Sequence, residues 1–252
     1  MNEMTIIHIP HASVYIPEEY KDSYRPKILR HEIDVMTDWF CDSLFDCGAE
    51  RIVFPVSRLL CDVERFRDDG EEAMAAVGMG VVYENRSDLS PLRQVSAGER
   101  EAILRRYYDP HHRRLGKAVR QRLERYGGCL IVDAHSFYPT PLPYEQDKSP
   151  LRPDFCIGTS AYHTPDTVAE GIAETLRSND YTVAFNAPFA GTIVPMEYYK
   201  KDARVHSVMI EVNRRLYLKA PGVKSDGFAD TKAVLTECIR LATEQNPILQ
   251  GA

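Results

Sequence analysis

Short apolar runs alternate with longer, helically spaced segments along most of this chain. A run of branched apolar residues favours a strand that is buried on both faces of a sheet. Strands that alternate with helices predict the α/β class, here a mostly parallel mixed sheet with helices on both faces. We expect strands at 5–10, 51–55, 130–132, 155–158, 181–185 and 205–212, and helices at 33–45, 97–126, 165–178 and 226–244.

Prolines and glycines predict where the helices start, stop and bend. The segment 97–126 is closed by Gly127, as is typical of a helix C-terminus, and Pro110 is expected to kink or divide it. Pro17 and Pro26 are expected to keep the segment around them out of regular helix.

Three segments without helical spacing are expected to surround a functional site. Residues 57–66 are predicted to be extended, because their charges are spaced through an otherwise strand-like apolar stretch. Residues 67–93 are polar and contain glycine, so we interpret them as a long excursion and a candidate lid. Residues 138–153 hold five prolines and follow the central strand, which makes them a candidate pocket wall.

Two histidines follow predicted strands at the point where each strand ends. His135 comes after the apolar run 130–132, and His11 comes after the run 5–10. Functional groups of open α/β sheets gather at the carboxyl ends of the strands, so we expect the two imidazoles to share a site. Neutral imidazole is a common metal ligand, and a neighbouring carboxylate can fix its tautomer. The alternative is that each histidine is an ordinary polar residue at a strand end.

Two aspartates on the predicted helix 33–45 offer a further metal ligand. Asp34 and Asp38 are one turn apart and would share a face of that helix. A carboxylate oxygen from one of them would complete a metal site with the histidines. The alternative is that both carboxylates complement the dipole of the first helical turn.

Three charged residues lie in apolar surroundings and need either a partner or a function. Arg58 and Arg65 would grip carboxylate or carbonyl oxygens of a ligand, a task that suits the guanidinium fork. Alternatively, the two arginines pair with Asp62 and Glu64. Glu211 lies inside the last apolar run, which is costly unless its carboxylate is paired or functional.

Together these residues are complete for metal-assisted hydrolysis of an amide. Two histidines and one carboxylate are common ligands of catalytic zinc, whose fourth position is left to water. A second carboxylate can act as general base toward that water, and arginines can hold the substrate and polarise its carbonyl. No local motif such as H-E-x-x-H occurs, so the combination carries the interpretation.

The composition argues against several other classes. The chain has 252 residues, 44% of them hydrophobic, and shows no linker or repeat, so we expect one domain over 1–252. The net charge of -6 comes from interspersed acidic and basic residues, which predicts neither a nucleic-acid nor a membrane partner. The N-terminus lacks a signal-peptide pattern, and the six cysteines include no C-x-x-C pair, which favours a cytoplasmic setting.

The ordered set of these motifs resembles the N-formylglutamate amidohydrolase family. The resemblance covers most of the chain, from residue 10 to about residue 213. No single motif is specific, whereas the order and spacing of the set are. The motifs are Pro10-His11-Ala12-Ser13, Thr37-Asp38-Trp39, Ser57-Arg58, Asp62-Val63-Glu64-Arg65, Asp133-Ala134-His135-Ser136 and Glu211.

The resemblance implies a fold similar to the zinc carboxypeptidases, aspartoacylase and succinylglutamate desuccinylase. It also implies a hydrolase with one zinc ion that cleaves the acyl-amide bond of an N-acyl amino acid, a small molecule such as N-formylglutamate. Two alternatives stay open at this point. One is a carboxypeptidase-type peptidase, and the other is a non-catalytic carboxylate-binding protein of the same fold.

The resemblance further implies a role for each site residue. In the related carboxypeptidases the third ligand is a Glu three residues after the first His, where this chain has Val14. Asp38 is the expected substitute, with Asp34 as the alternative. The implied roles are His11 and His135 as zinc ligands, Glu211 as general base, Arg58 on the scissile carbonyl, Arg65 on the substrate carboxylate, and substrate contacts from Glu64, Ser136 and Thr192.

Two positions depart from the family pattern, both where substrate would be held. Glu64 stands where the related enzymes usually have Asn, and we expect it to repel or pair Arg65. The loop 191–195 lacks the Thr-Arg that usually follows its glycine. These differences leave the metal chemistry intact, and they leave the identity of the acyl group and the amino acid open.

Overall fold

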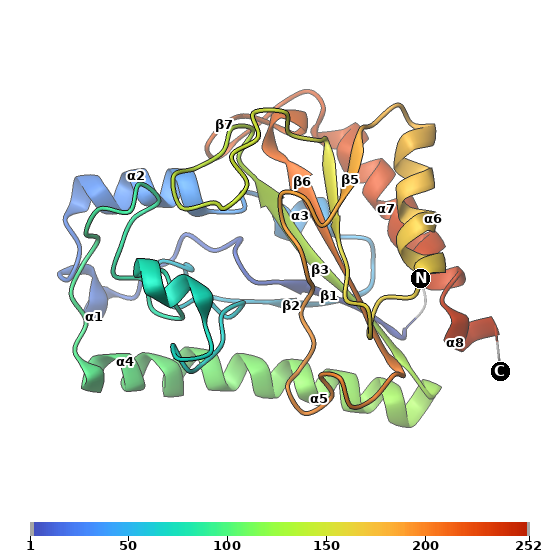
Figure 1. The fold of residues 1–252 in the computed structure, drawn as a ribbon, viewed down its shortest axis with the longest axis horizontal. Helices are drawn as coiled ribbons and strands as arrows, with labels where there is room; N and C mark the ends of the chain where they lie inside the picture. The colour runs from blue at the N-terminus through green and yellow to red at the C-terminus, as the bar shows by residue number, and fades with distance from the viewer. Residues whose placement is uncertain (1–2, 251–252) are drawn as a thin grey trace.

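A six-stranded sheet forms the centre of the computed structural model, which describes residues 3–250 (Figure 1). The strand order is β2-β1-β3-β6-β4-β5, and the first four of these strands are parallel, whereas β4 and β5 run in the opposite direction. The predicted mostly parallel α/β architecture is therefore confirmed. The strands are β1 (Thr5–Ile9), β2 (Glu50–Val53), β3 (Cys129–Phe137), β4 (Phe155–Gly158), β5 (Val183–Phe185) and β6 (Val205–Asn213), with a separate hairpin of β7 (Leu218–Ala220) and β8 (Val223–Lys224).

Helices cover both faces of the sheet (Figure 1). Alternate residues of a strand point to opposite faces. Ile6 and Ile131 accordingly pack against α5, whereas Ile7 and Val132 pack against α3, α6 and α7. Between residues 3 and 250 no helix is both long and apolar enough to cross a membrane. The helices are α1 (Glu18–Lys21), α2 (Pro26–Met36), α3 (Cys41–Leu44), α4 (Ala97–Ile103), α5 (Asp109–Tyr126), α6 (Asp166–Ser178), α7 (Phe228–Glu244) and α8 (Pro247–Gln250).

The segment 97–126 is helical throughout, but it changes its winding in the middle. A π-helical turn, η2 (Leu104–Tyr108), separates α4 from α5. Pro110 lies in the first turn of α5, directly after the π-helical turn, so the regular α-helical pattern is interrupted next to the residue that lacks a backbone N–H. Gly127 ends the helix in the left-handed conformation, with φ of 74°. The predicted helix, its interruption near Pro110 and its glycine terminus are all confirmed.

The predicted helix at 33–45 is wrong in its boundaries. Helix α2 starts at Pro26, which occupies the first turn instead of excluding a helix, and it ends at Met36. Thr37 is extended, and Phe40 is left-handed with φ of 61°. The backbone N–H of Asp38 leaves the helical pattern and donates to the carbonyl of His11 at 3.0 Å. Tertiary hydrogen bonding therefore overrides the apolar spacing at this point.

The predicted extended segment at 57–66 is also wrong, because these residues form consecutive turns. The carbonyl of Ser57 accepts hydrogen bonds from the N–H groups of Leu60 and Cys61, at 2.9 and 3.3 Å. The N–H of Asp62 donates to the carbonyl of Val81 at 2.8 Å, which ties this segment to the excursion that follows it. Buried apolar side chains alternate with charged ones here because the turns pack on a core, not because a strand is present.

The excursion 67–93 is a packed part of the protein and not a detached lid. It contains one short 3-10 helix, η1 (Ala73–Val77). Met79, Val81 and Tyr83 are fully buried in a cluster with residues of α2 and of the π-helical turn η2. Such burial opposes the free opening and closing that a lid requires.

Gly158, the last residue of β4, lets a loop approach the sheet closely. A Cβ atom at this position would lie 2.2 Å from the Gly191 carbonyl oxygen and 2.4 Å from the Met209 Cε. Real atoms do not approach so closely, so the backbone of the loop would have to shift. The position of that loop therefore depends on the absence of a side chain at residue 158.

We predict that Gly158→Ala lowers the free energy of unfolding by about 1–3 kcal/mol, the usual effect of overpacking. Gly98→Ala is the matched control, because Gly98 lies in the first turn of α4 with no atom within 4 Å of an added Cβ. That variant should be unchanged or more stable by up to about 1 kcal/mol. Urea denaturation measures both. Equal stability of Gly158→Ala and the unmodified protein would contradict the close approach.

Candidate metal centre

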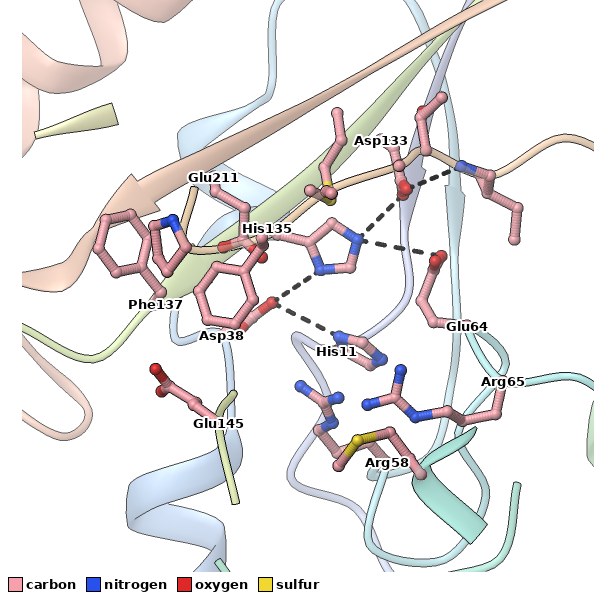
Figure 2. Close-up of a pocket in the computed structure, with 18 of the residues that line it drawn as sticks. His11, Asp38, Arg58, Glu64, Arg65, Asp133, His135, Phe137, Glu145 and Glu211 are labelled. Carbon is pink, nitrogen blue, oxygen red and sulfur yellow. Dashed lines mark hydrogen bonds and ion pairs between the residues drawn. The ribbon is translucent and has the colours of Figure 1, made fainter. Parts of the chain in front are cut away.

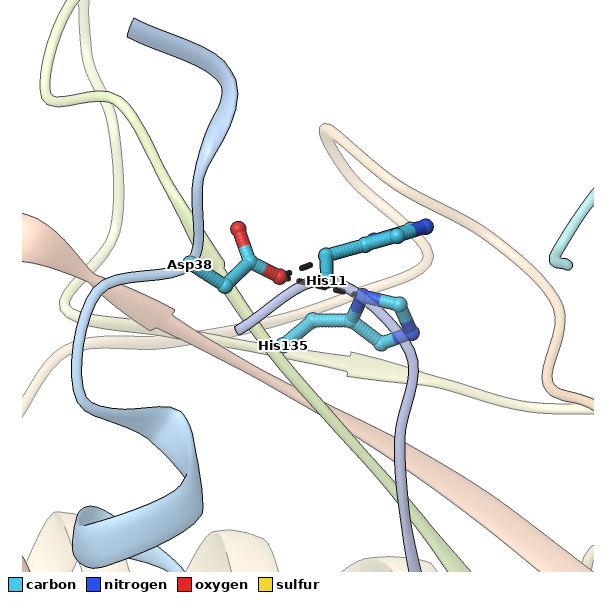
Figure 3. A group of neighbouring side chains, drawn as sticks. All are labelled: His11, Asp38 and His135. Carbon is cyan, nitrogen blue, oxygen red and sulfur yellow. Dashed lines mark ion pairs between the residues drawn. The ribbon is translucent and has the colours of Figure 1, made fainter. Parts of the chain in front are cut away.

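Three buried side chains from distant parts of the chain converge on one point (Figure 3). They are His11, Asp38 and His135, and one ligand atom from each lies within 4.8 Å of the others. The Asp38 Oδ2 atom is 3.7 Å from the His11 Nδ1 and 3.4 Å from the His135 Nδ1. The structure thus brings together the three residues expected to bind a metal ion.

The sheet explains how His11 and His135 meet. His11 lies two residues beyond the end of β1. His135 is not at a strand end as expected; it lies inside β3, because pairing with β6 continues as far as Phe137 and Asn213. The polar residues do not stop the strand, since alternate positions send Asp133 and His135 to the same face as the site.

Asp38 reaches the histidines because α2 has already ended. Its backbone bond to the His11 carbonyl fixes the chain directly beside His11. Asp34, the alternative ligand, stays on α2 and contacts Arg30 at 3.7 Å, one helical turn away. The two aspartates therefore do not share a face, and only Asp38 enters the candidate metal centre.

The spacing and the unmet bonding capacity of these atoms fit a metal ion. Ligand atoms about 2.0–2.2 Å from a tetrahedral zinc ion lie about 3.3–3.6 Å apart. The two distances from Asp38 Oδ2 are close to that range. The His11 Nδ1 and Asp38 Oδ2 atoms are buried and have no hydrogen-bond partner. Buried polar atoms without a partner are costly, so their presence here favours a ligand between them.

A charged side chain contacts the second polar atom of each candidate ligand, the one that does not face the candidate metal centre. The His11 Nε2 contacts the Asp62 carboxylate at 2.8 Å, and the His135 Nε2 contacts Asp133 at 3.1 Å. A carboxylate that accepts the Nε2–H fixes the imidazole tautomer that leaves Nδ1 as the ligand atom. Arg214 Nη2 donates to the Asp38 Oδ1 at 2.9 Å, which leaves Oδ2 for a metal ion.

Strong electrostatic coupling shifts the pKa values of the ligands. Burial by itself would raise the pKa of Asp38, but its contacts with His11, His135 and Arg214 hold it well below the usual range. Burial would lower the pKa of His135, but Asp133 and Asp38 hold it well above the usual range. Asp38 is therefore ionised, and a proton on His135 competes with a metal ion for the imidazole.

A second group of possible ligands, formed by His8, Glu64 and Asp133, is closed by direct contacts. His8 Nδ1 is hydrogen-bonded to Asp133 at 2.9 Å and lies 3.1 Å from the Glu64 carboxylate, and both separations are shorter than the about 3.3–3.6 Å between ligand atoms of a tetrahedral zinc ion. Burial would lower the pKa of His8, but the two carboxylates raise it to about 9. His8 is therefore an imidazolium that neutralises its neighbours. Its Nε2 faces His111 at 2.8 Å, and burial lowers the pKa of His111 to about 2, which keeps that ring a neutral acceptor.

Glu211 lies beside His135, because the two residues are register partners on β6 and β3 (Figure 2). Its side chain is buried, and its Oε2 atom has no hydrogen-bond partner. Burial raises the pKa of Glu211 to about 8. The charge of Asp38 also raises this pKa, whereas His135 and Arg214 lower it. A carboxyl group that changes protonation near neutral pH is suited to proton transfer.

The two arginines of the 57–66 segment, Arg58 and Arg65, line a cavity that Glu211 and the candidate metal ligands also line (Figure 2). Arg58 Nη2 bonds to Asp62 at 2.8 Å, and both Nε and Nη2 donate to the Tyr83 hydroxyl, at 3.2 and 3.0 Å. Arg65 has only a distant contact with Asp62, at 3.9 Å, and its Nε has no hydrogen-bond partner. Glu64 was expected to repel or pair Arg65, but no ion pair between these two described residues is recorded. Its carboxylate lies 3.1 Å from the His8 Nδ1 instead.

The two small polar residues expected to contact substrate are already bonded to the protein. Ser136 Oγ accepts a hydrogen bond from the Nε of Arg214 at 3.1 Å. Thr192 Oγ1 lies 2.7 Å from Ser207 Oγ. Both residues line the cavity, but their hydroxyl groups hold its walls in place.

The three residues of the candidate metal centre line a cavity of about 650 Å³. One wall is formed by Tyr138, Leu142 and residues 144–147, in the loop that was expected beside the site, and another is formed by residues 186–194 together with Met196. The second loop is anchored to the centre, because the N–H of Ile193 donates to the Asp133 Oδ2 at 3.2 Å.

Sequence reasoning missed several residues that complete this site. Asp62 was considered only as an arginine partner, yet it also holds His11. Arg214 directly follows β6, and its position after a strand end is the signal that could have indicated it. Tyr83 lies in the excursion 67–93, and no local pattern links it to Asp62, to whose Oδ2 it donates at 2.6 Å.

Comparisons with known proteins indicate the family of this chain. A family model described as N-formylglutamate amidohydrolase matches residues 4–218. An N-formylglutamate deformylase from Pseudomonas aeruginosa is 27% identical over 216 residues, which cover 81% of this chain and 80% of that protein. One from Pseudomonas putida is 26% identical over 227 residues, which cover 85% of this chain and 81% of that protein.

Two solved structures share the fold. The N-formylglutamate amidohydrolase from Ralstonia eutropha JMP134 superposes with a TM-score of 0.80 and 22% identity, covering 99% of this chain and 95% of that one. A gene product from Agrobacterium tumefaciens gives a TM-score of 0.71 and 17% identity, covering 96% and 91%. The family model spans most of the chain, and this chain therefore belongs to the N-formylglutamate amidohydrolase family.

Proposed function

We propose that this protein is a metal-dependent amidohydrolase that removes the acyl group from an N-acyl amino acid such as N-formylglutamate. One observation supports the metal most strongly. Two imidazole Nδ1 atoms and one carboxylate oxygen converge, while a carboxylate or an arginine occupies the far side of each ligand. The curated relatives, which are named N-formylglutamate deformylases, support the reaction class.

Zinc is the proposed ion, bound by His11, Asp38 and His135. Two histidines and one carboxylate are a common ligand set of catalytic zinc. When bound, such an ion polarises a carbonyl group and lowers the pKa of a water molecule. His11 and His135 would be oriented for this task by Asp62 and Asp133, which hold their Nε2 atoms.

Arg58 and Arg65 would position the substrate above this site. Arg65 has no hydrogen bond to its Nε and lies at the cavity, so it is suited to a bidentate contact with the substrate carboxylate. Arg58 is fixed by Asp62 and Tyr83, which pre-orients its guanidinium toward the scissile carbonyl without cost at the moment of reaction.

Glu211 would carry the proton. Its unpaired Oε2 accepts a proton from the attacking water and then delivers it to the nitrogen of the departing amine. The water oxygen forms a bond to the acyl carbon, and the bond from that carbon to nitrogen breaks. The products are a carboxylate and a free amino acid, so hydrolysis needs no further reactant.

We also propose a single domain in a reducing compartment. The described residues share one central sheet, which supports one domain, while the two residues at each end lie outside the described range. All six cysteines are free, and five of them are buried, which suits a cytoplasmic protein. A cavity walled by two loops favours a small molecule over a polypeptide substrate.

Replacing a ligand should remove the metal. We predict that His11→Ala, His135→Ala and Asp38→Asn each lose stoichiometric zinc while remaining folded, because three protein ligands are needed to hold a catalytic ion. Asp34→Asn is the matched control and should keep full occupancy, since Asp34 lies outside the centre. Elemental analysis with circular dichroism measures both properties. Full zinc occupancy in the three ligand variants would refute the assignment.

Replacing the proposed base should separate binding from turnover. We predict that Glu211→Gln keeps the metal and most substrate affinity but loses at least ~100-fold in kcat, the usual scale for general-base catalysis. Glu174→Gln, on the exposed side of α6, is the control and should keep normal rates. Steady-state kinetics decide the matter, and turnover near that of the unmodified protein in Glu211→Gln would exclude this role.

Replacing Arg65 should act on substrate affinity. Arg65→Lys replaces a guanidinium, which can bind the substrate carboxylate through two hydrogen bonds, with an ammonium group that acts as a point charge. We therefore predict a rise in KM of about 10-fold with kcat little changed. Arg67→Lys is the control, because Arg67 is an exposed partner of Glu101 and Asp109. If KM is unchanged in Arg65→Lys, this arginine is a structural partner of Asp62 and not a substrate ligand.

A further inference from the structure

Most of the positive charge in the cavity is already neutralised. Three arginines line it: Arg58, Arg65 and Arg214. Arg58 is paired with Asp62 at 2.8 Å, and Arg214 is paired with Asp38 at 2.9 Å. Both carboxylates are buried, so removing either arginine from its partner would leave an isolated charge inside the protein.

Arg65 is the one arginine of the lining that has no close ionic partner. Its nearest recorded carboxylate contact is 3.9 Å away. His112 also lines the cavity, but its Nε2 lies 3.0 Å from the Val63 carbonyl, and burial lowers its pKa to about 4, which makes it neutral. Lysine does not occur among the lining residues. Outside the candidate metal centre, the described lining residues therefore offer one cationic side chain, Arg65, for a ligand carboxylate.

Several acidic residues also line the cavity. Glu64, Glu145, Asp147 and Glu211 do so in addition to Asp38 of the candidate metal centre and Asp133, which contacts His135. Glu145 is already paired with Arg152. A second carboxylate on a ligand would find no free cationic side chain among these lining residues, and an unpaired charge in such a place opposes binding.

The wall formed by the 186–196 loop is apolar where it meets the cavity. Pro188, Phe189, Ile193 and Met196 line it, and the Phe189 ring packs edge-on against Phe137 at 5.8 Å. The polar groups of this wall are turned to the protein: Asn186 bonds to Thr159, and Thr192 to Ser207. Phe137 and Arg65 lie on opposite sides of the candidate metal centre (Figure 2).

From this distribution of charge we infer that the preferred substrate carries a single carboxylate and an apolar group, and is an N-formyl derivative of an apolar amino acid in preference to N-formylglutamate. This inference rests on the proposed function. The carboxylate contacts Arg65, and the apolar group contacts the wall of Phe137, Phe189 and Met196. Specificity then arises mainly from the missing second cation, which penalises a dicarboxylate.

Three ligands of similar length isolate the effect of charge. N-formylmethionine is apolar, N-formylglutamine is polar and neutral, and N-formylglutamate carries a second carboxylate. We expect Glu211→Gln, whose turnover should be at least about 100-fold slower, to bind N-formylmethionine at least about 10-fold more tightly than N-formylglutamate in titration calorimetry, with N-formylglutamine between them. Equal or tighter binding of N-formylglutamate would overturn the inference.

A charge added to the apolar wall should shift this order. Met196 is 54% exposed at the rim, so an arginine fits there without disturbing the core. In the Glu211→Gln background, Met196→Arg should strengthen N-formylglutamate binding relative to N-formylmethionine by about 10-fold, whereas Met196→Gln, the neutral control, should not. The same shift in both variants would overturn the charge explanation.

Hydrolysis by the unmodified protein separates this inference from the proposed function. Cleavage of N-formylmethionine with a kcat/KM at least about 10-fold above that of N-formylglutamate supports both. A preference for N-formylglutamate supports the proposed function and overturns the inference. If none of the three compounds is cleaved by zinc-loaded protein, the proposed function fails, and the binding order still decides whether the cavity selects a single carboxylate.

Discussion

Buried carboxylates behind the two histidines are the constraint on which the rest of the site depends. Asp62 and Asp133 hold the Nε2 atoms of His11 and His135, so both Nδ1 atoms face Asp38. These carboxylates cannot remain charged in the interior without cations of their own. Arg58 forms an ion pair with Asp62, and His8 forms one with Asp133. These two cations stabilise the carboxylates that hold the histidines.

The sheet supplies the precision that this arrangement needs. Parallel register places His8 beside Asp133 and His135 beside Glu211, on the face that also receives His11. Side chains on neighbouring strands lie about 4.8 Å apart, which suits groups that share a proton or an ion. Asp38 comes from outside the sheet and is fixed by a backbone bond to His11. The strands β1 and β3 therefore position the two histidines of the centre, and the irregular segment after α2 adds Asp38.

The sequence was sufficient for the α/β architecture and for His11, His135 and Glu211 as residues of one site, because strand periodicity and isolated polar residues are local signals. The preference for Asp38 over Asp34 came from the resemblance to the family. It was insufficient for the path of the chain between elements. The turns at 57–66 and the end of α2 depend on backbone bonds to Val81 and His11, which are distant in sequence. Glu64 was expected to repel or pair Arg65. It is attracted instead by the imidazolium of His8, which is also distant in sequence.

Anomalous X-ray diffraction at the zinc absorption edge, on crystals of the zinc-loaded protein, locates the metal ion directly. We expect one strong peak between His11 Nδ1, Asp38 Oδ2 and His135 Nδ1, at about 2.0–2.2 Å from each atom. A peak among His8, Glu64 and Asp133, or no peak in zinc-saturated crystals, would contradict this expectation.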